Sequence, residues 1–551
     1  MSLPRLNFTR QPILPAIALF CLAVGTAWAD ELRDQIDLRI DEKARSRQVS
    51  MAPASEDAEF LRRIWLDLVG TIPSAQETRQ FLKDPSPGKR TALIERLLAD
   101  PRYPVRMAEA FHVQLMERSG EDEGWMKYLT AAFEENKPWH VMAREILAPD
   151  FQNEARRSAG FFITRRLEKV GSQQTDYPGL TRDVGRLFMG VDLQCCQCHK
   201  HPSVGDYKQQ EFNGLFVAYQ NIKLNEPAGA TKVKWFSEGL VTEKYEFTSV
   251  LSGVKGATGP RVPFGKEFSV PELPEAERWQ VAPDKKTKQG GIPKFSPVSS
   301  LAEGIASVEN PYFAKNIANR LWWQFMGRGL VEPLDLVHSD NPASHPELLE
   351  DLSAALVKQG FDLKWLVREL VNTKTYQRSG RLGAMKEAPS EETFAMAMER
   401  PVSAEQFARA FLEATGEFER VALTREWEGL AEKPLVWKTV KASFTNAFAN
   451  APKEPELRVN PSLRGALFLR NNETVLWALK ARTGNLLERA AALGSPQAIA
   501  EELYLSVFTR KPAPEETELL ARHLGKAEDK TQANAEFLWA MLASTEFFTN
   551  H

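Results

Sequence analysis

The spacing of apolar residues limits the fold of this chain more than any other feature of the sequence. Apolar side chains recur every three or four positions over most of its length, and Phe60, Ile64, Trp65 and Leu68 form one such face. Residues at this spacing lie on one side of an α-helix. The pattern predicts helices at 107–116, 125–133, 139–147, 180–189, 361–371, 404–412, 467–479, 499–508 and 533–548. The fold is therefore expected to be mainly α.

The segment from residue 221 to residue 299 has a different character. Apolar and polar residues alternate at 233–236 and 245–250, as in short strands, and Gly253, Gly256 and Gly259 interrupt the chain. A chain of this length is long enough for two or more domains. We therefore expect two helical domains, at 30–220 and 300–551, joined by a small β-rich or irregular insert at 221–299.

Two helix starts carry the pattern of a capping box. Ser74 is followed by Glu77, and Ser344 is followed by Glu347. In this arrangement the serine hydroxyl and the glutamate carboxylate each satisfy a backbone N–H of the first turn. Both serines are therefore predicted to precede a helix directly.

Residues 1–29 are expected to be a secretory signal peptide. Arg5 and Arg10 precede an apolar stretch at 13–24, and Ala-Trp-Ala at 27–29 precedes Asp30. The alternative is a membrane anchor, but Pro15 interrupts the apolar stretch, which is shorter than the roughly 20 residues that span a bilayer. Cleavage would place the chain in the periplasm or elsewhere in the cell envelope. No later segment is expected to cross a membrane.

The cysteines are crowded together instead of being spread along the chain. Loss of Cys21 with the signal peptide leaves Cys195, Cys196 and Cys198, so no framework of long-range disulfides can form. The formal net charge is −3 and there is no basic stripe, so no nucleic-acid partner is expected. The cysteines therefore point to local chemistry.

Cys195, Cys198 and His199 form a C-x-x-C-H sequence, which is typical of covalent attachment of one c-type haem. Two thiols three positions apart on a helical turn can reach both vinyl groups of one porphyrin, and the adjoining imidazole can bind the iron. We therefore expect Cys195 and Cys198 to hold haem c and His199 to be a ligand of its metal. Attachment takes place outside the cytoplasm, so the motif and the signal peptide support each other.

Two other interpretations of the cysteine cluster remain open. A zinc site needs about four ligands, and no second cysteine pair exists, although His201 and a distant histidine would be available. A redox-active dithiol would use Cys195 and Cys198. Cys196 has no role in any of these sites, and is either a buried bystander or a thiol that mispairs with its neighbours.

The second axial ligand of the iron has to come from elsewhere in the chain. The candidates are Met107, His112, Met116, Met126, His140, Met142 and Met189, although packing in the core is the commoner role of a methionine. A second protein ligand favours electron transfer, whereas an open position allows small molecules to bind the iron.

The motifs resemble those of two-part proteins found in planctomycetes and related bacteria. The first half is similar to the PSCyt-type (planctomycete cytochrome) domain of unknown function, through WLDLVGTIP at 65–73, NKPW at 136–139 and QCCQCHKHP at 194–202. The second half resembles the PSD-type domain, through NPYFA at 310–314, NRLW at 319–322, GRGLVE at 327–332, SHPELL at 344–349 and STEFF at 544–548. The resemblance implies haem attachment at Cys195, Cys198 and His199, and a link to exported sulfatase-like proteins. Such domains usually have a small residue where Cys196 stands.

A polar group outside the cysteine cluster lies in the second half. It comprises Arg320, Arg328, Glu332 and Asp335, close in sequence to Trp322 and Trp323. These side chains either line a pocket between domains or form an ion-paired helix cap, and the cap is favoured because arginine and tryptophan are common packing residues.

Three functions agree with these features. The leading hypothesis is an exported c-type haem protein that transfers electrons to a redox partner protein. The second is a binding or scaffold protein of the envelope, linked to polysaccharide degradation, in which the cysteine cluster holds a structural metal or a disulfide. The third is a haem enzyme with an open iron position, and only this one makes the chain a catalyst.

Overall fold

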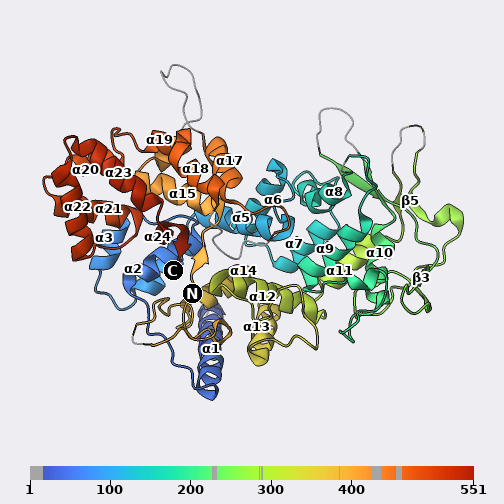
Figure 1. Cartoon of the computed structure of the whole chain (residues 1–551). Helices are drawn as coiled ribbons and strands as arrows, with labels where there is room; N and C mark the ends of the chain where they lie inside the picture. Colours follow the sequence, from blue (N-terminus) through green and yellow to red (C-terminus); the bar gives the residue numbers. More distant parts are fainter. Residues whose placement is uncertain are drawn as a thin grey trace, which may run out of the picture.

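The structure, a computed structural model, describes residues 17–169, 171–225, 233–284, 286, 290–383, 385–423, 436–454 and 462–551 (Figure 1). Helices make up 55% of the chain, and the only sheets in the described part are small two-stranded ones, so the expected mainly α fold is confirmed. Residues 1–16 of the expected signal peptide, with the side chains of residues 17–31, lie outside the description, and the signal peptide stays a prediction.

The first half is helical from residue 17 to residue 219. Its α-helices are α1 (Ile17–Ser46), α2 (Asp57–Leu68), α3 (Ala75–Lys83), α4 (Lys89–Leu98), α5 (Arg102–Met116), α6 (Glu123–Glu134), α7 (Trp139–Leu147), α8 (Phe161–Leu167), α9 (Tyr177–Met189) and α10 (Gln209–Tyr219). The four helices predicted here from periodicity are all present, as α5, α6, α7 and α9. Two short 3-10 helices, η1 (Arg157–Gly160) and η2 (Cys195–Gln197), interrupt the loops.

The middle segment contains short antiparallel strand pairs. These are β1 (Ile222–Asn225) with β2 (Trp235–Glu238), β3 (Tyr245–Thr248) with β4 (Lys255–Thr258), and β5 (Trp279–Val281) with β6 (Ile292–Pro293). The strands expected near residues 233 and 245 are therefore confirmed as β2 and β3. A short 3-10 helix, η3 (Glu275–Glu277), precedes β5.

The second half is again helical. Its α-helices are α11 (Pro297–Ile305), α12 (Pro311–Met326), α13 (Pro346–Lys358), α14 (Leu363–Asn372), α15 (Ala404–Thr415), α16 (Phe418–Leu423), α17 (Trp437–Phe448), α18 (Leu463–Asn471), α19 (Glu473–Ala478), α20 (Leu486–Ala491), α21 (Pro496–Val507), α22 (Pro514–Lys526), α23 (Lys530–Leu542) and α24 (Thr545–Phe548). A 3-10 helix, η4 (Glu391–Thr393), lies between α14 and α15. The last strand pair, β7 (Arg400–Pro401) with β8 (Thr549–Asn550), ties the chain end to residue 400.

Two of the predicted helices are each divided in two. The helix expected at 467–479 breaks at Asn472, which is extended and accepts the N–H of Thr474 at 2.9 Å, so that α19 starts anew after α18. The helix expected at 533–548 breaks at Ser544, which is also extended, between α23 and α24. Asn472 explains the first break, because its side chain satisfies a free N–H group at the start of α19. The Ser544 side chain makes no capping bond to α24, and its hydroxyl instead donates to the Met541 carbonyl at 2.7 Å, at the end of α23.

One of the two predicted capping boxes is present. Ser74 and Glu77 exchange both hydrogen bonds at the start of α3. The prediction for Ser344 was wrong, because His345 precedes α13 and no side chain caps it. Ser344 instead donates its N–H to the carbonyl of Leu330 at 2.7 Å, and its hydroxyl lies 3.1 Å from His345 Nδ1.

The hydrophobic interior forms two clusters that do not follow the order of the chain. The first extends from Leu32 to Phe394 and draws on both helical halves. The second consists of buried apolar residues within the range 407–547, together with Leu66 and Ile72 from the start of the chain. Figure 1 shows α2 and α3 lying beside α21 and α22 at one end of the molecule, while the strand pairs of the middle segment lie at the other. No helix in the described part has the length and apolar character needed to span a membrane.

Candidate functional site

The C-x-x-C-H sequence lies in the loop between α9 and α10, and its start is fixed against the second half of the chain. Gly190 ends α9 in a left-handed conformation (φ 70°), where a Cβ atom would come within 2.8 Å of Val337 Cγ2. Val191 then forms a bridge with Leu336, and Asp192 donates its N–H to the Asp335 carbonyl at 2.9 Å. The close approach of Val337 therefore requires glycine at position 190.

The cysteines occupy a tight helical turn, as the sequence predicts. Cys198 N–H donates to the carbonyl of Cys195 at 3.3 Å, and His199 N–H donates to the same oxygen at 3.2 Å. Arg182 of α9 holds the turn from outside through a 2.9 Å hydrogen bond to Gln197 Oε1. Cys195, Cys198 and His199 are thus carried by one short, hydrogen-bonded unit.

The three cysteines differ in their surroundings. All are free thiols; Cys195 is half-buried, Cys198 is exposed and Cys196 is fully buried in the first hydrophobic cluster. Burial raises the pKa of the Cys196 thiol to about 12, so it stays protonated. Cys196 is therefore a packing residue of the core, in agreement with the interpretation of it as a buried bystander.

The two histidines after the cysteines have different ring tautomers when neutral. His199 is exposed, and its Nδ1 lies 2.6 Å from the Lys200 carbonyl oxygen. Because a carbonyl can only accept, Nδ1 carries the proton and Nε2 keeps its lone pair. His201 Nδ1 instead accepts the N–H groups of Ser203 and Val204, so its proton is on Nε2. Only His199 offers the nitrogen that a metal needs, with the second hydrogen bond that metal-binding histidines commonly make.

An exposed apolar surface adjoins the cysteine turn. It is the tip of the β3–β4 hairpin, formed by Val250, Leu251 and Val254, whose side chains are 70%, 71% and 65% exposed. The Val250 N–H donates to the Cys198 carbonyl at 3.0 Å, so this hairpin tip is attached to the turn itself. Exposed apolar clusters of this kind commonly mark a place where another molecule binds.

These residues fit a covalently held haem. The accessible thiols and the Nε2 of His199 match the attachment chemistry, and the hairpin tip provides an apolar surface beside them. Within the described ranges, no group of three or more His, Cys, Asp and Glu side chains is placed to hold a metal ion. The zinc interpretation therefore finds no further ligands in that part of the chain.

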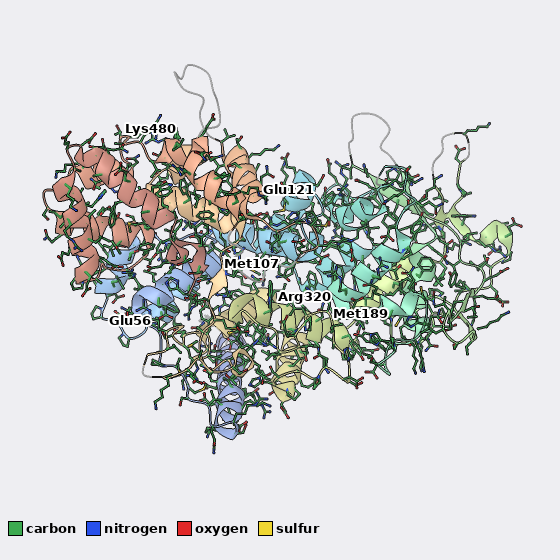
Figure 2. All side chains as sticks on the ribbon, in the orientation of Figure 1. Glu56, Met107, Glu121, Met189, Arg320 and Lys480 are labelled. Atoms are coloured by element: carbon green, nitrogen blue, oxygen red, sulfur yellow. The ribbon has the colours of Figure 1, made fainter. Side chains whose placement is uncertain are left out.

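Most candidates for a second iron ligand lie in the interior. Met107, Met116, Met142 and Met189 are fully buried in the first cluster, and Figure 2 places Met107 near the centre of the molecule. His112 is buried and accepts the Trp125 Nε1–H at 3.1 Å through Nδ1. His140 packs against Phe361, and Met126 is partly buried. The buried methionines have the packing role expected from their residue type.

Comparison with protein families agrees with the two-part sequence. Residues 35–224 match PSCyt2, a protein of unknown function (DUF1549), and residues 299–524 match PSD1, a protein of unknown function (DUF1553). The chain thus contains a match to PSCyt2 followed by a match to PSD1, in the order that the sequence motifs predict. No curated protein and no solved structure matches it. The cysteine turn lies within PSCyt2, and Val337, which packs against Gly190, lies within PSD1.

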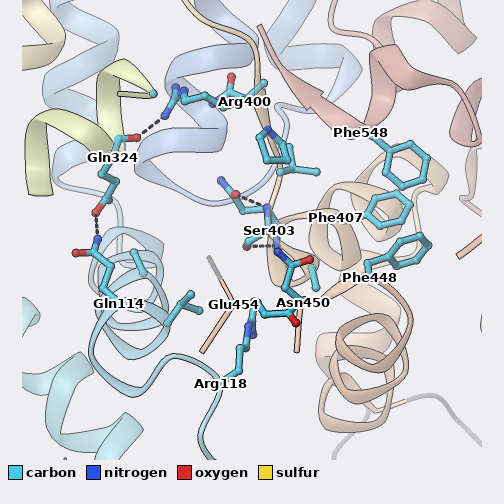
Figure 3. A pocket seen from close by; sticks show the side chains of 18 of the residues that line it. Gln114, Arg118, Gln324, Arg400, Ser403, Phe407, Phe448, Asn450, Glu454 and Phe548 are labelled. Carbon is cyan, nitrogen blue, oxygen red and sulfur yellow. Dashed lines mark hydrogen bonds between the residues drawn. The ribbon is translucent and has the colours of Figure 1, made fainter. Parts of the chain in front are cut away.

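The polar group predicted in PSD1 is divided between two places. Arg320 and Asp335 pair with each other and line a cavity of about 590 Å³, whereas Arg328 lies 4.0 Å from Glu391, and Glu332 accepts the Gly329 N–H at 3.0 Å. Both interpretations are thus met in part, because the pocket residues are themselves ion-paired. Residues of both matches line this cavity, and Figure 3 shows Gln114 of PSCyt2 hydrogen-bonded to Gln324 of PSD1 on one side of it.

Most of the cavity could not be predicted from the sequence. Its walls come from α5, α12, α15, α18 and the chain end, which are widely separated along the chain. Arg106 and the phenylalanines Phe407, Phe448 and Phe548 were missed for this reason. Each of them has helical spacing with its own neighbours and resembles an ordinary core or surface residue.

Proposed function

We propose that the PSCyt2 domain binds one haem covalently through Cys195 and Cys198, with His199 as an axial ligand, and that the protein transfers electrons in the cell envelope. The observation that carries the proposal is the turn at 195–199, which separates the accessible thiols of Cys195 and Cys198 from the buried thiol of Cys196.

The residues of the turn would each contribute a definite function. Cys195 and Cys198 fix the ring, and the Lys200 carbonyl holds the His199 imidazole in the orientation and tautomer that expose Nε2. The Val250 N–H holds the apolar hairpin tip beside the cysteine turn, where it would shield a bound haem from water. The haem would supply a one-electron redox centre, whose potential depends on its ligands and on burial. An exposed turn suits exchange of electrons with a partner protein.

The test is secretion of the chain, with its own signal peptide, from cells that attach c-type haem. We expect haem staining after a denaturing gel, and an intact mass equal to the polypeptide plus one haem. The double variant Cys195→Ser/Cys198→Ser should lose the haem, while the matched variant Cys196→Ala should keep it. A bare polypeptide mass for the wild type would refute the proposal and favour the envelope scaffold.

Carbon monoxide separates electron transfer from an enzyme with an open iron. A reduced protein with a second side-chain ligand should show little spectral change when carbon monoxide is added. A large shift would favour the haem enzyme. Because the methionines of the first cluster are buried, a second ligand from that set would require the side chain to move.

A further inference from the structure

We propose that the cavity between PSCyt2 and PSD1 binds a small molecule with an anionic head, a carboxylate or a phosphate, on an apolar body, and that Arg106 receives the head. The site is separate from the cysteine turn and does not depend on haem. The cavity has a volume of about 590 Å³, within the roughly 300–1,000 Å³ that is usual for sites of small ligands.

Arg106 is a buried cation to which the described residues offer no partner. Its side chain lines the cavity from α5 and is 9% exposed, yet it makes no hydrogen bond or ion pair with any residue that the structure describes. Burial lowers the pKa of its guanidinium, but arginine remains charged in proteins. A buried charge without a counter-ion is costly, so an anion that enters the cavity would relieve this cost.

A neighbouring glycine, Gly70, makes room for the side chain of Arg106. Gly70 has a φ of +77°, and a Cβ atom there would lie 2.9 Å from Arg106 Cδ. The absence of a side chain at position 70 therefore gives the arginine room to pass. Glu109 and Asp67, the carboxylates that act most strongly on the pKa of Arg106, are already engaged. Glu109 is paired with Arg409 through two hydrogen bonds, and Asp67 is paired with Arg400 at 2.7 Å.

The remaining buried or half-buried charges around the cavity compensate one another. The pairs are Asp67 with Arg400, Glu117 with Arg186, Asp335 with Arg320, and Glu405 with Arg118. Asp67 also accepts the Tyr376 hydroxyl and the Asn550 amide, at 2.7 and 2.8 Å, so its oxygens are satisfied. Among the buried and half-buried residues that the structure describes, the excess charge is therefore the positive charge of Arg106, which favours an anionic ligand.

The other end of the cavity is apolar and aromatic. The rings of Phe407 and Phe448 lie 4.8 Å apart, and those of Phe407 and Phe548 lie 4.4 Å apart. Figure 3 shows these three rings together, on the opposite side from Gln114, Gln324 and Arg400. Trp323 also lines the cavity and stacks with no other described aromatic ring. A ligand that fills the space must therefore combine an apolar body with its charged head.

The test uses the full mature chain and probes that share a phenyl ring. They are 3-phenylpropionate, phenyl phosphate and the neutral 3-phenylpropionamide. In calorimetry and thermal unfolding, we expect one or both anions to bind saturably and to raise Tm, and the amide to bind at least tenfold more weakly. The better anion identifies the head as carboxylate or phosphate. Absence of saturable binding by both anions, or equal binding of the amide, would overturn the proposal.

The variant Arg106→Gln tests the residue itself. It should weaken anion binding at least tenfold, while its Tm without ligand should not fall below that of the wild type, because a buried unpaired charge has been removed. The matched control is Arg102→Gln on the same helix, since Arg102 is paired with Asp100 at 2.7 Å and does not line the cavity. Should Arg106→Gln fail to fold, Arg106→Lys must still prefer the anions to the amide. Wild-type anion affinity in Arg106→Gln, or no such preference in Arg106→Lys, contradicts the assignment.

Discussion

The backbone N–H of Val250 donates a 3.0 Å hydrogen bond to the carbonyl oxygen of Cys198. This contact places an exposed hairpin tip directly beside the turn that carries the accessible thiols. Val250 and Leu251 are 70% and 71% exposed, so neither contributes much to the core. Their position is explained if another apolar surface, such as a porphyrin ring, lies against them.

Replacing Leu251 by serine should affect a bound haem more than the fold. Because the side chain is exposed, we expect the free energy of unfolding to change by less than about 0.5 kcal/mol. The haem-loaded variant should have a lower reduction potential, since greater contact with water favours the more highly charged oxidised iron. Redox titration checks this, and an unchanged potential would show that the hairpin tip does not cover the ring.

Alanine at position 196 should destabilise the protein, whereas alanine at position 198 should not. Cys196 is fully buried, and loss of its sulfur leaves a cavity that costs about 1–2 kcal/mol. Cys198 is exposed, so Cys198→Ala should stay within about 0.5 kcal/mol of the wild type. Urea unfolding of the haem-free proteins measures both. Equal losses in the two variants would contradict the opposite burial of the two thiols.

The left-handed residue at the end of α9 should tolerate no side chain. In Gly190→Ala the new methyl would lie 2.8 Å from Val337 Cγ2, and the alanine backbone would have to adopt a φ of 70°. We therefore expect the free energy of unfolding to fall by at least about 2 kcal/mol. Gly171 provides the control, because its φ is +62° but nothing lies within 4 Å of its added Cβ. Gly171→Ala should therefore cost only the backbone strain, about 1 kcal/mol, in the same unfolding experiment.

Stability should fall as the pH drops below the usual range of histidine. Burial lowers the pKa of His112 to about 4, against about 6.5 in an unfolded chain. The unfolded state binds the proton more readily, so the neutral His112 contributes to the free energy of unfolding. This contribution is complete above pH 6.5, and about 2–3 kcal/mol of it is lost progressively as the pH falls to about 4. His112→Gln keeps an acceptor for Trp125 but does not titrate, so its stability should decline less over this window. Parallel profiles for the two proteins would show that His112 is not the group responsible.

Local patterns predicted the local structure well. The periodicity at 139–147 gives α7 with both ends correct, and five adjacent residues were enough to predict the turn at 195–199. The capping box at Ser74 was equally visible, because its partners are three positions apart. Ser344 has the same spacing, but a hydrogen bond to the distant Leu330 carbonyl places it elsewhere.

The features that could not be predicted all depend on contacts between distant segments. No spacing rule connects Cys198 with Val250, or Arg106 with Phe448. The burial of Cys196 between two accessible thiols also depends on packing, since the three residues share one sequence motif. That no residue in the described part of the chain pairs with Arg106 becomes visible only when the neighbouring carboxylates there have been assigned to other cations.

Arg62 donates a 3.1 Å hydrogen bond to the carbonyl of Val507, 445 positions later in the chain. It is fully buried and bonds the Phe547 carbonyl as well, while Leu66 and Ile72 belong to the cluster built by the last helices. During synthesis these early side chains therefore stay exposed until the ribosome has released nearly the whole polypeptide, because their partners come last in the chain. A protein truncated at the insert would keep them permanently in water and would be prone to aggregate.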